Sequence, residues 1–446
     1  MFTSVRARLC SAFVVWVPLA ACGHSATLTV ADGTGPTPQL PPPRTSLIPT
    51  VKVADAKAWQ DGEHPTATSG TTVSLFADGL DHPRWLYVLP NGDVLVAETN
   101  APPRPDDSKG IKGWFINHYM KKAGAAVKSA NRITLLRDAD GDGIVDSRTV
   151  LIDSLNSPFG MALIDGYLYV ANTDNVVRFP YKRGQMQIAS KGVPVSPLPA
   201  GPINHHWTKN IVASADGSKL FATVGSNSNA GENGIDNERE RAAVWEIDLT
   251  TGSHRVFASG MRNPVGLAWE PKTGALWTSV NERDELGSDI VPDYMTALRD
   301  GAFYGFPYSY FGQHLDPRVK EQRPDLVARA LVPDYALGPH TASLGLVWSP
   351  ENSLLPSEFR NGMIVSQHGS WNRDPRSGYK VIFIPFENGK PSGPPVDLVT
   401  GFLDSHDNAK GRPVGVAFDT RGALLIADDV GNRIWRVTAT PTLTTR

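Results

Sequence analysis

Hydrophobic and polar residues alternate in a repeated pattern from Thr72 onward, in which a short apolar strand, a tight turn and a second apolar strand follow one another. Asn-Gly, Asp-Gly or Gly in the turns supplies the positive φ angles that hairpins need. Further apolar strands, such as residues 132–138, lie between the copies, so each unit has about four strands, as a propeller blade does. The copies begin at His82, Ser157, Lys209, Asn263, Ala342 and Arg412.

The two ends of the repeat region complement each other. A lone strand at residues 72–80 opens the region, and residues 433–440 close it as a third strand without a fourth behind it. The N-terminal strand can therefore complete the last blade. We predict an all-β, six-bladed β-propeller that spans residues 71–440 and is closed by the N-terminal strand. An immunoglobulin-like array is the weaker alternative, because the repeats lack its Cys and Trp spacing.

Two stretches interrupt the repeats. Residues 108–130 have helical propensity and an amphipathic, basic character, so they can pack over a blade or lie on a lipid surface, and packing is favoured. Residues 283–339 are too long for a simple turn, and we expect a long loop insertion there. Insertions of this size often form walls or lids.

The N-terminus reads as a secretory leader. Arg6 and Arg8 precede a short apolar run that ends in Leu-Ala-Ala-Cys at Cys22. This ending resembles a bacterial lipobox, which predicts a lipoprotein signal peptide over residues 1–21 and a lipid on Cys22. Ordinary cleavage nearby is the alternative. The Gly after Cys22 favours the outer membrane, so we expect a periplasm-facing lipoprotein of the bacterial cell envelope.

Composition narrows the picture further. Residues 22–70 are rich in Pro, Thr and Gly, which predicts a tether between lipid and domain. The formal net charge is only −2 and no basic stripe with interleaved aromatics is found, so nucleic-acid binding is not expected. Cys10 and Cys22 are the only cysteines and both lie in the leader, so no disulfide holds the mature domain.

Polar residues flank the repeated strand pairs. In a blade the innermost strand leaves one face of the ring and the second strand returns to it, so the flanking residues meet on that face. The residues before the first strands are Asp81, His82, Arg84, Asn156, His205, His206, Arg262, Asn263, His340 and Arg412. The residues after the second strands include Glu98, Asn172, Asp174, Ser226, Asn227, Glu282, Asp284, His368, Trp371, Asn372, Arg373, Asp428 and Asp429.

This ring suits an anionic, planar ligand with a metal. Histidines exchange protons near neutral pH, and arginines present fixed forks to carboxylates. The alternative is that the face of a propeller is rich in polar loops and that these residues cap strand ends.

A separate signal is the segment Asp-Ala-Asp-Gly-Asp-Gly-Ile-Val-Asp. Acidic residues at alternate positions next to glycine supply the hard oxygen ligands and the sharp turn of calcium loops. The segment departs from an EF-hand because Thr149 occupies loop position 12, and an Asp/Gly-rich hairpin turn is the alternative. It lies on a connection between strands, away from the ring. Its acidic residues are Asp138, Asp140, Asp142 and Asp146.

With these motifs in place, the chain resembles the quinoprotein sugar dehydrogenases, six-bladed propellers that use pyrroloquinoline quinone (PQQ) and calcium. It is most similar to their L-sorbosone dehydrogenase and pyranose dehydrogenase-like branch. The resemblance covers about Val73 to Val437. Its most specific segments are INHHWTKN, VGSNSN, GMRNPVGLAWEP, VNERDELGSD, DGAFYGFPYSY, GPHTASLGL, QHGSWNR and GRPVGVA.

The resemblance implies roles for individual residues. His206 would be the general base that removes the proton of a substrate hydroxyl, with His205 beside it. Arg262 and Asn263 would contact the quinone oxygens, so Arg262 belongs to both the catalytic and the cofactor-binding group. Calcium at the cofactor would use the main-chain carbonyls of Glu282 and Arg283. The other residues implied in cofactor binding are His340, His368, Arg373 and Arg412.

Two positions depart from the family pattern. Ser226 and Asn227 stand where the best-known members have an aspartate that orients the base, so the orienting residue is unassigned. His368 to Arg373 stand where some members have a lysine that contacts the cofactor. These changes bear on sugar specificity more than on quinone chemistry.

The sequence thus predicts a PQQ-dependent dehydrogenase that oxidises a sugar hemiacetal or aldehyde to a lactone or acid. Electrons would pass onward to a quinone or a cytochrome, and the lipid anchor would hold the protein at a membrane. Two alternatives remain: a calcium-dependent propeller hydrolase of the lactonase type, whose carboxylates and Asn bind the metal directly, and a non-catalytic propeller that binds at the cell surface.

Overall fold

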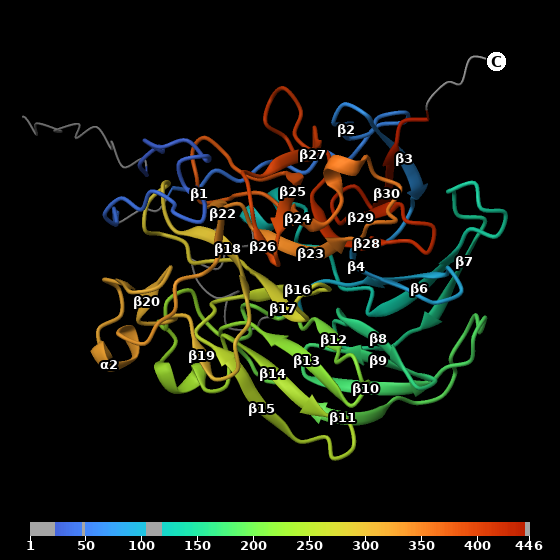
Figure 1. Ribbon diagram of the computed structural model, residues 1–446, viewed down its shortest axis with the longest axis horizontal. Coiled ribbons are helices and arrows are strands. Elements are labelled where there is room, and N and C mark those ends of the chain that lie inside the picture. Colours follow the sequence, from blue (N-terminus) through green and yellow to red (C-terminus); the bar gives the residue numbers. More distant parts are fainter. Residues whose placement is uncertain (1–22, 47–49, 104–117, 442–446) are drawn as a thin grey trace, which may run out of the picture.

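The structure, a computed structural model, describes residues 23–46, 50–103 and 118–441 as six sheets around a common axis (Figure 1). The innermost strands of neighbouring sheets contact one another in the order β4, β8, β12, β16, β23, β28 and back to β4. The all-β, six-bladed propeller is thereby confirmed.

Each blade has four antiparallel strands, ordered from the axis outward. Blades 1 and 2 consist of β4 (Pro83–Val88), β5 (Val94–Glu98), β6 (Arg132–Arg137) and β7 (Ser147–Ile152), and of β8 (Met161–Ile164), β9 (Tyr167–Ala171), β10 (Asn175–Pro180) and β11 (Val193–Pro197). Blades 3 and 4 consist of β12 (Ile211–Ala213), β13 (Lys219–Val224), β14 (Ala243–Asp248) and β15 (His254–Ser259), and of β16 (Pro264–Glu270), β17 (Ala275–Val280), β18 (Pro292–Ala297) and β22 (Tyr335–Pro339). Blade 5 consists of β23 (Ser343–Ser349), β24 (Gly362–Gln367), β25 (Lys380–Glu387) and β27 (Val396–Thr400), with β26 (Lys390–Pro391) beside β25.

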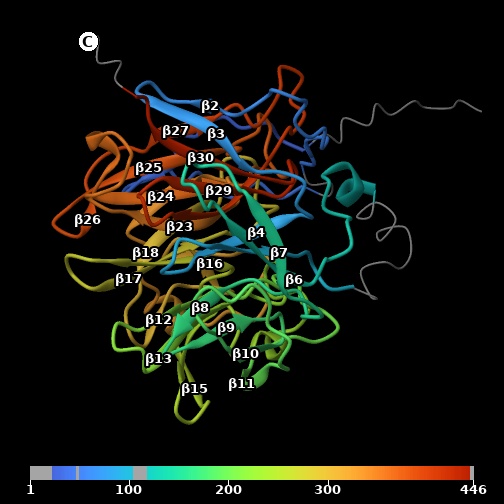
Figure 2. The same ribbon diagram turned by 90° about the vertical axis from the view of Figure 1, so that its right-hand side faces the viewer.

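Blade 6 closes the ring as the sequence predicts. It joins β28 (Pro413–Phe418), β29 (Leu424–Asp428) and β30 (Arg433–Ala439) to the N-terminal strand β3 (Thr71–Ala77). The register runs antiparallel from Thr71 opposite Ala439 to Ala77 opposite Ile434. Figure 2 shows β3 lying directly beside β30, so the two ends of the domain are held in one sheet.

Glycines in the innermost strands let neighbouring blades approach closely. A Cβ added to Gly266 would lie 2.5 Å from the Leu346 Cβ, and one added to Gly345 would lie 2.3 Å from the Val414 carbonyl oxygen. A Cβ at Gly415 would lie 2.8 Å from the Arg84 carbonyl oxygen. Each glycine thus faces the backbone or Cβ of the next blade, where no side chain has room.

Apolar side chains fill the axis beneath the polar ring. They come from all six blades, one at or shortly before the start of each innermost strand, and all belong to one buried cluster: Trp85, Phe159, Trp207, Val265, Leu344 and Val414. Each follows a polar ring residue by one to four positions in the chain. The polar face of the ring therefore rests on a packed floor that keeps water from the axis.

The Pro/Thr/Gly-rich segment differs from the predicted tether, because its described residues lie on the propeller. β1 (Thr34–Gly35) adds to β22, and β2 (Thr66–Ala67) adds to β27. The Trp59 Nε1 donates to the Asp428 Oδ2 at 2.7 Å, and its ring packs edge-on against Trp435. Residues 23–46 and 50–59, the N-terminal strap, are thus held by long-range contacts that composition does not reveal.

The insertion in blade 4 is shorter than predicted. β18 and β22 form the outer strands of the blade, so the inserted part is residues 298–334. Nearly every residue of β18 and β22 is buried, so neither strand shows the apolar and polar alternation that marks an exposed strand. The insertion carries β19 (Ala302–Phe303), β20 (Ser309–Tyr310), β21 (His314–Leu315) and α2 (Pro324–Val327).

The predictions for residues 108–130 and for the N-terminal leader fall only partly within the described residues. In the 108–130 insertion, residues 118–122 are helical, and the Ala56 N–H donates to the Lys122 carbonyl at 2.8 Å, so this part packs on the strap. Residues 104–117, the signal peptide at 1–21 and Cys22 lie outside the described residues. No helix among the described residues is long and apolar enough to cross a membrane. Two short 3-10 helices, η1 (Ile235–Glu238) and η2 (Ser357–Phe359), complete the fold.

Candidate active site

His206 lies at the ring face, where blade 3 begins, and its Nδ1 contacts Ser226. Its Nδ1 lies 2.9 Å from the Ser226 carbonyl oxygen and 2.9 Å from the Ser226 Oγ. Ser226 follows β13 and is fully buried. The structure therefore gives the unassigned orienting position to the serine that replaces the expected aspartate. His205 is half-buried beside His206.

Gly225 makes this arrangement sterically possible. A Cβ at this position would lie 2.3 Å from the His206 Cβ and 2.6 Å from the Asn263 Oδ1. Asn263 is buried, and its Oδ1 has no hydrogen-bond partner. Unpaired buried polar atoms are costly, so this amide is a group that a ligand could satisfy. His206 and Asn263 thus lie close together on either side of Gly225.

Arg262 is also at the ring, but all five of its N–H groups are used within the protein. Its Nη1 donates to the carbonyls of Asn281 and Glu282, at 3.3 and 2.7 Å. Its Nε donates to the Asn229 carbonyl at 3.3 Å, and its Nη2 donates to the Asn229 Oδ1 at 3.0 Å and to the Asp284 Oδ2 at 3.2 Å. Arg262 therefore places a buried positive charge beside Asn263 rather than an open fork.

Asp284 and His340 complete this side of the ring. The His340 Nδ1 lies 3.3 Å from the Asp284 Oδ1, and its Nε2 lies 2.8 Å from the Gly287 carbonyl oxygen. Burial would raise the pKa of Asp284, but the hydrogen bond from His340 and the charge of Arg262 hold it below its usual value. Asp284 is therefore an anion that balances Arg262, and His340 braces it.

Arg283 anchors the blade 4 insertion to the same loop. Its side chain is fully buried, with Nη1 2.7 Å from the Asp316 Oδ2 and Nη2 donating to the Ser309 carbonyl at 2.8 Å. Arg318 donates to the same carboxylate at 2.8 Å and to the Asp284 carbonyl. The insertion thus forms a fixed wall beside the ring.

A second buried charge cluster joins blades 1, 5 and 6. The Asp429 Oδ2 accepts hydrogen bonds from the Arg84 Nη1 at 2.8 Å and the His368 Nε2 at 2.9 Å, and the His82 Nε2 lies 3.6 Å away. Arg412 adds a further positive charge nearby. These five residues are the Asp429 cluster. The sequence placed all of them on the ring face but assigned only His368 and Arg412.

Burial sets the charges in this cluster. It lowers the pKa of His82 to about 4 and also lowers the pKa of His368. Burial would raise the pKa of Asp429, but His368, His82 and Arg84 hold it far below its usual value. At neutral pH the two histidines are therefore neutral, and Arg84 and Arg412 supply the positive charge that faces the Asp429 carboxylate.

The Asp429 cluster fits an anionic ligand. The Nε atoms of Arg84 and Arg412, the His82 Nε2 and the Asp429 Oδ1 are buried without hydrogen-bond partners. Arginines beside unpaired donors are suited to carboxylates. The Nε of Arg373 is also unpaired, but its Nη1 and Nη2 both donate within the protein, to the carbonyls of Pro375 and Leu28 at 2.6 and 2.9 Å. Arg373 therefore fastens the N-terminal strap to the exit of blade 5.

The acidic loop between β6 and β7 lies away from this face, as predicted. Carboxylate oxygens of Asp138, Asp140 and Asp146 lie within 4.8 Å of one another, and Asp142 is outside that group. The loop is already braced, because Asp138 accepts backbone hydrogen bonds from Gly141 and Gly143 and an ion pair from Arg421 at 3.3 Å. These contacts fit a self-satisfied turn and leave calcium there a prediction.

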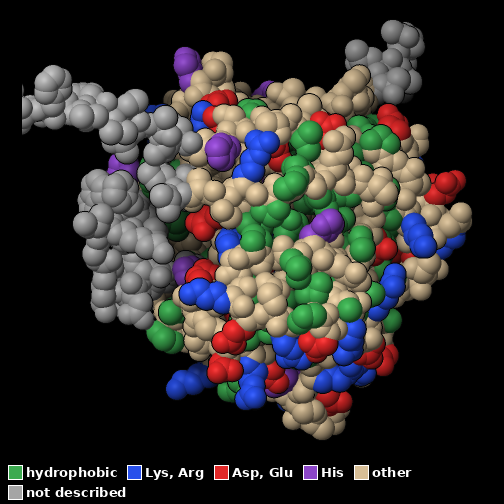
Figure 3. Space-filling view, turned by 90° about the vertical axis from the view of Figure 1, so that its left-hand side faces the viewer, with side chains coloured by type: hydrophobic (Ala, Val, Ile, Leu, Met, Phe, Trp, Pro, Cys, Tyr) green, Lys and Arg blue, Asp and Glu red, His purple; other side chains and the backbone are tan. Residues whose placement is uncertain are grey.

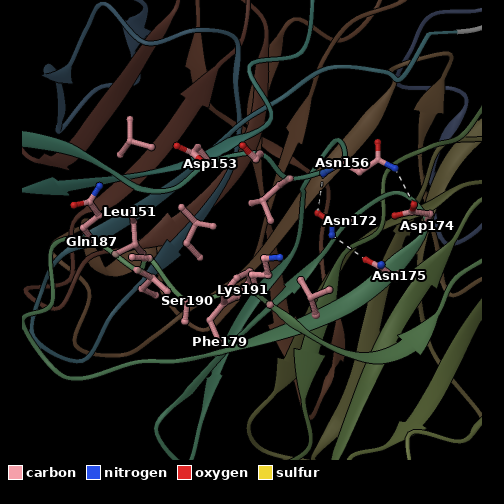
Figure 4. A pocket seen from close by; sticks show the side chains of 18 residues that line it. Leu151, Asp153, Asn156, Asn172, Asp174, Asn175, Phe179, Gln187, Ser190 and Lys191 are labelled. Carbon is pink, nitrogen blue, oxygen red and sulfur yellow. Dashed lines mark hydrogen bonds between the residues drawn. The ribbon is translucent and has the colours of Figure 1, made fainter.

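A cavity of about 570 Å³ opens between blades 1 and 2, apart from the buried charges. Figure 4 shows Asn156, Asn172, Asp174 and Asn175 at one end of it. There the Asn156 Nδ2 donates to the Asp174 Oδ2 at 2.8 Å, and the Asn172 Nδ2 donates to the Asn175 Oδ1 at 2.8 Å. These side chains mainly pair with one another, so they act as strand caps.

On the side seen in Figure 3, acidic and basic side chains are interspersed.

Comparison with known proteins identifies the family. Residues 125–295 and 316–440 match the TrAA12-like family, so the chain belongs to it. A PQQ-dependent pyranose dehydrogenase from Coprinopsis cinerea is 22% identical over 438 residues, which are 82% of this chain and 53% of that protein. The chain thus spans about half the length of that relative. An uncharacterised protein from Borreliella burgdorferi is 28% identical over 295 residues, covering 64% of this chain and 76% of that protein.

Solved structures share the fold. A calcium structure of the family AA12 enzyme from Trichoderma reesei has a TM-score of 0.68 at 17% identity, covering 87% of this chain and 99% of that one. The holo PQQ domain of the Coprinopsis cinerea pyranose dehydrogenase has a TM-score of 0.67 at 21% identity, covering 87% and 100%. A PQQ-bound aldose sugar dehydrogenase from Streptomyces coelicolor has a TM-score of 0.55 at 17% identity, covering 84% and 100%.

Proposed function

We propose that the protein is a PQQ-dependent dehydrogenase that oxidises a sugar hemiacetal or aldehyde to a lactone or acid. One observation carries the proposal: an imidazole held through Nδ1 lies on the same ring face as a buried, positively charged cluster with unpaired donors. The TrAA12-like family and the names of the relatives support it. The segments INHHWTKN and GRPVGVA support the sorbosone dehydrogenase-like branch within this class.

The donor set fits PQQ, which carries several carboxylates on a planar ring. Arg84 and Arg412 would hold carboxylates, and the Asn263 amide would contact the ring system. When bound, PQQ supplies a quinone that accepts a hydride. His82 and His368 are neutral at neutral pH, so they would contribute hydrogen bonds rather than charge.

The chain's own residues then move the proton and shape the site. His206 Nε2 removes the proton from the substrate hydroxyl, while Ser226 holds Nδ1. The buried charge of Arg262 stabilises negative charge that develops near Asn263. Trp85 and Trp207 in the apolar floor exclude water, which strengthens these electrostatic effects.

Calcium at Glu282 and Arg283 does not fit the arrangement of these residues. The Glu282 carbonyl accepts a hydrogen bond from the Arg262 Nη1 at 2.7 Å, and a guanidinium in this position repels a cation. No step is therefore assigned to calcium at this loop.

The lactonase alternative is weakened by the same contacts. A direct metal site needs carboxylates that face the ligand, but Asp284 is paired with Arg262 and Asp429 is paired with Arg84. Both carboxylates are already neutralised. A dehydrogenase that binds an anionic cofactor uses the remaining positive charge, whereas a calcium hydrolase does not.

Attachment through Cys22 and transfer of electrons to a quinone or cytochrome belong to the same proposal. The Leu-Ala-Ala-Cys motif supports the lipid anchor and a periplasm-facing location in the cell envelope. Radiolabelled palmitate in cells that express the wild-type protein or the Cys22→Ala variant tests this part. Label on the variant would contradict it.

Reconstitution tests the main proposal. Purified apoprotein is titrated with PQQ, with and without added Ca²⁺, and both the absorption spectrum and dye reduction with a panel of aldoses and sugar aldehydes are followed. The proposal predicts saturable spectral change and sugar-dependent dye reduction. Turnover without PQQ, or hydrolysis of a lactone panel by the apoprotein, would contradict it.

A further inference from the structure

We propose that Ser226 is the positioning residue of His206, acting as a neutral partner that is fixed from behind by the buried carboxylate of Glu238. The inference rests on the proposed function, in which His206 is the base. Ser226 stands at the position where the resemblance implies an aspartate that orients the base.

The direction of the hydrogen bonds determines the tautomer. The Ser226 Oγ donates its hydrogen to the Ser228 carbonyl at 2.6 Å, so toward His206 it can only accept. The Ser226 carbonyl, 2.9 Å from the same Nδ1, is also an acceptor. Both contacts therefore hold the proton of the neutral ring on Nδ1. Nε2 is left as the nitrogen that can accept a proton from a hydroxyl.

Glu238 fixes the loop that presents Ser226. The Asn227 N–H donates to the Glu238 Oε2 at 2.7 Å, and the Ser228 Oγ donates to its Oε1. Ser226 and Ser228 are fully buried, and Glu238 is 8% exposed. The backbone of the loop is further tied by the Ser226 N–H, which donates to the Arg262 carbonyl at 2.7 Å. The carboxylate thus acts through the loop.

Other titratable groups surround this arrangement, and burial lowers the pKa of Lys209 well below its usual value. The Lys209 Nζ donates to the His206 carbonyl at 3.3 Å, and Asp174 is near Lys209. Arg241 donates to the Asn204 Oδ1 at 3.0 Å and lies near Glu238. At Nδ1 itself, Ser226 supplies only dipoles, so an Asp at this position would add a full negative charge and stabilise the imidazolium.

Nitrogen-15 NMR of the histidine-labelled apoprotein tests the tautomer without any turnover. His206 is assigned by comparison with His206→Asn. In the wild type and in Ser226→Thr, which keeps the hydroxyl, the neutral ring should carry its proton on Nδ1. Ser226→Ala, which loses the hydroxyl but keeps the backbone carbonyl, should raise the share of the Nε2-protonated tautomer, and Glu238→Gln should do the same. Ser226→Asp should raise the pKa of His206 by about 1 unit or more.

A wild-type ring protonated on Nε2, or an unchanged His206 pKa in a folded Ser226→Asp variant, would overturn the inference. If Ser226→Asp does not fold, unchanged tautomers in Ser226→Ala overturn it instead. An unchanged tautomer in Glu238→Gln would overturn the role assigned to Glu238. These results stand even if the wild type oxidises no sugar, so failure of the inference and failure of the proposed function are distinguishable.

Kinetics add a second readout. Ser226→Ala should lower kcat about tenfold while KM and the Kd for PQQ stay within about twofold, because only the base is misplaced. Ser226→Thr should restore the wild-type kcat. In Ser226→Asp the acid limb of the kcat/KM profile should move to higher pH. Equal losses of kcat and of PQQ binding in Ser226→Ala would indicate a merely structural role and overturn the inference.

Discussion

Arg84 and Asp429 form a buried ion pair at the closure of the ring, with the Arg84 Nη1 2.8 Å from the Asp429 Oδ2. Arg84 lies near the start of β4 in blade 1 and Asp429 directly follows β29, the second strand of blade 6, so the pair joins the first and last blades. The same carboxylate accepts a hydrogen bond from His368 of blade 5. The closure of the fold and the proposed anion site therefore share one carboxylate.

Asp429→Asn should destabilise the protein strongly. It leaves buried positive charge without a counter-ion, which typically costs about 3–5 kcal/mol. The lowered pKa of Asp429 means that its contribution is fully present above about pH 4 and is lost as the pH falls below that value. The difference in unfolding free energy between wild type and variant should thus be constant above about pH 5 and shrink below about pH 4. A difference that grows with acidity would contradict this assignment.

The lowered pKa of His82 implies a second pH dependence of the protein's stability. Burial lowers its pKa to about 4, so between about pH 4 and 6.5 the unfolded chain binds more protons than the folded protein. Stability should therefore fall as the pH is lowered through this range. Denaturant unfolding of His82→Gln should show a smaller decrease over the same range, and an identical decrease would contradict the buried, neutral state of His82.

Arg412→Gln should weaken binding of PQQ about ten- to a hundredfold, because a hydrogen bond to a charged group contributes about 1.5–3 kcal/mol. Fluorescence titration of the apoprotein measures this. The matched control is Arg376→Gln, whose guanidinium is engaged by Asp407 and by the carbonyls of Lys52 and Val53. Equal weakening in both variants would assign the effect to the strap rather than to cofactor contact.

Gly225→Ala should lower kcat strongly while the propeller stays folded. The added Cβ would lie 2.3 Å from the His206 Cβ, so the imidazole must move. Such a displacement of the base is expected to lower kcat by about a hundredfold. Gly393→Ala is the control, because the nearest atom to its added Cβ is a side-chain carbon of Pro385 at 3.2 Å. Wild-type kcat in a folded Gly225→Ala variant would contradict the close approach.

Asp289→Ala should release the start of the N-terminal strap. Asp289 accepts hydrogen bonds from the backbone N–H groups of Thr27 and Leu28 at 3.0 Å and from the Thr27 Oγ1 at 2.7 Å. Limited proteolysis should then cleave within residues 23–46 faster than in the wild type. Unchanged cleavage would show that the remaining contacts hold the strap alone.

The ring of blades could be predicted from sequence because its signals are local. Alternating apolar residues and glycine turns mark each strand pair, and the missing fourth strand of the last blade required β3. β18 and β22 were missed because both are buried throughout and are separated by the inserted residues 298–334. Their pairing depends on contacts that no local pattern encodes.

Local sequence patterns also could not predict the packing of the N-terminal strap or the residue that orients His206. Thr27 and Asp289 are 262 positions apart, so a Pro/Thr/Gly-rich composition alone indicated a tether. The ring residues were placed on one face by the repeat, yet the saturation of Arg262 and the anchoring by Arg373 depend on which acceptors surround them. A serine after a strand is a common cap, and its role became visible only from the 2.9 Å contacts to the His206 Nδ1.

A comparison of wild type with His206→Asn at equal PQQ content tests whether His206 is the general base of a PQQ-dependent oxidation. We expect kcat to fall by about 10²- to 10⁴-fold, because a general base is lost, while the Kd for PQQ stays within about threefold. Wild-type kcat in a fully loaded His206→Asn variant would contradict it.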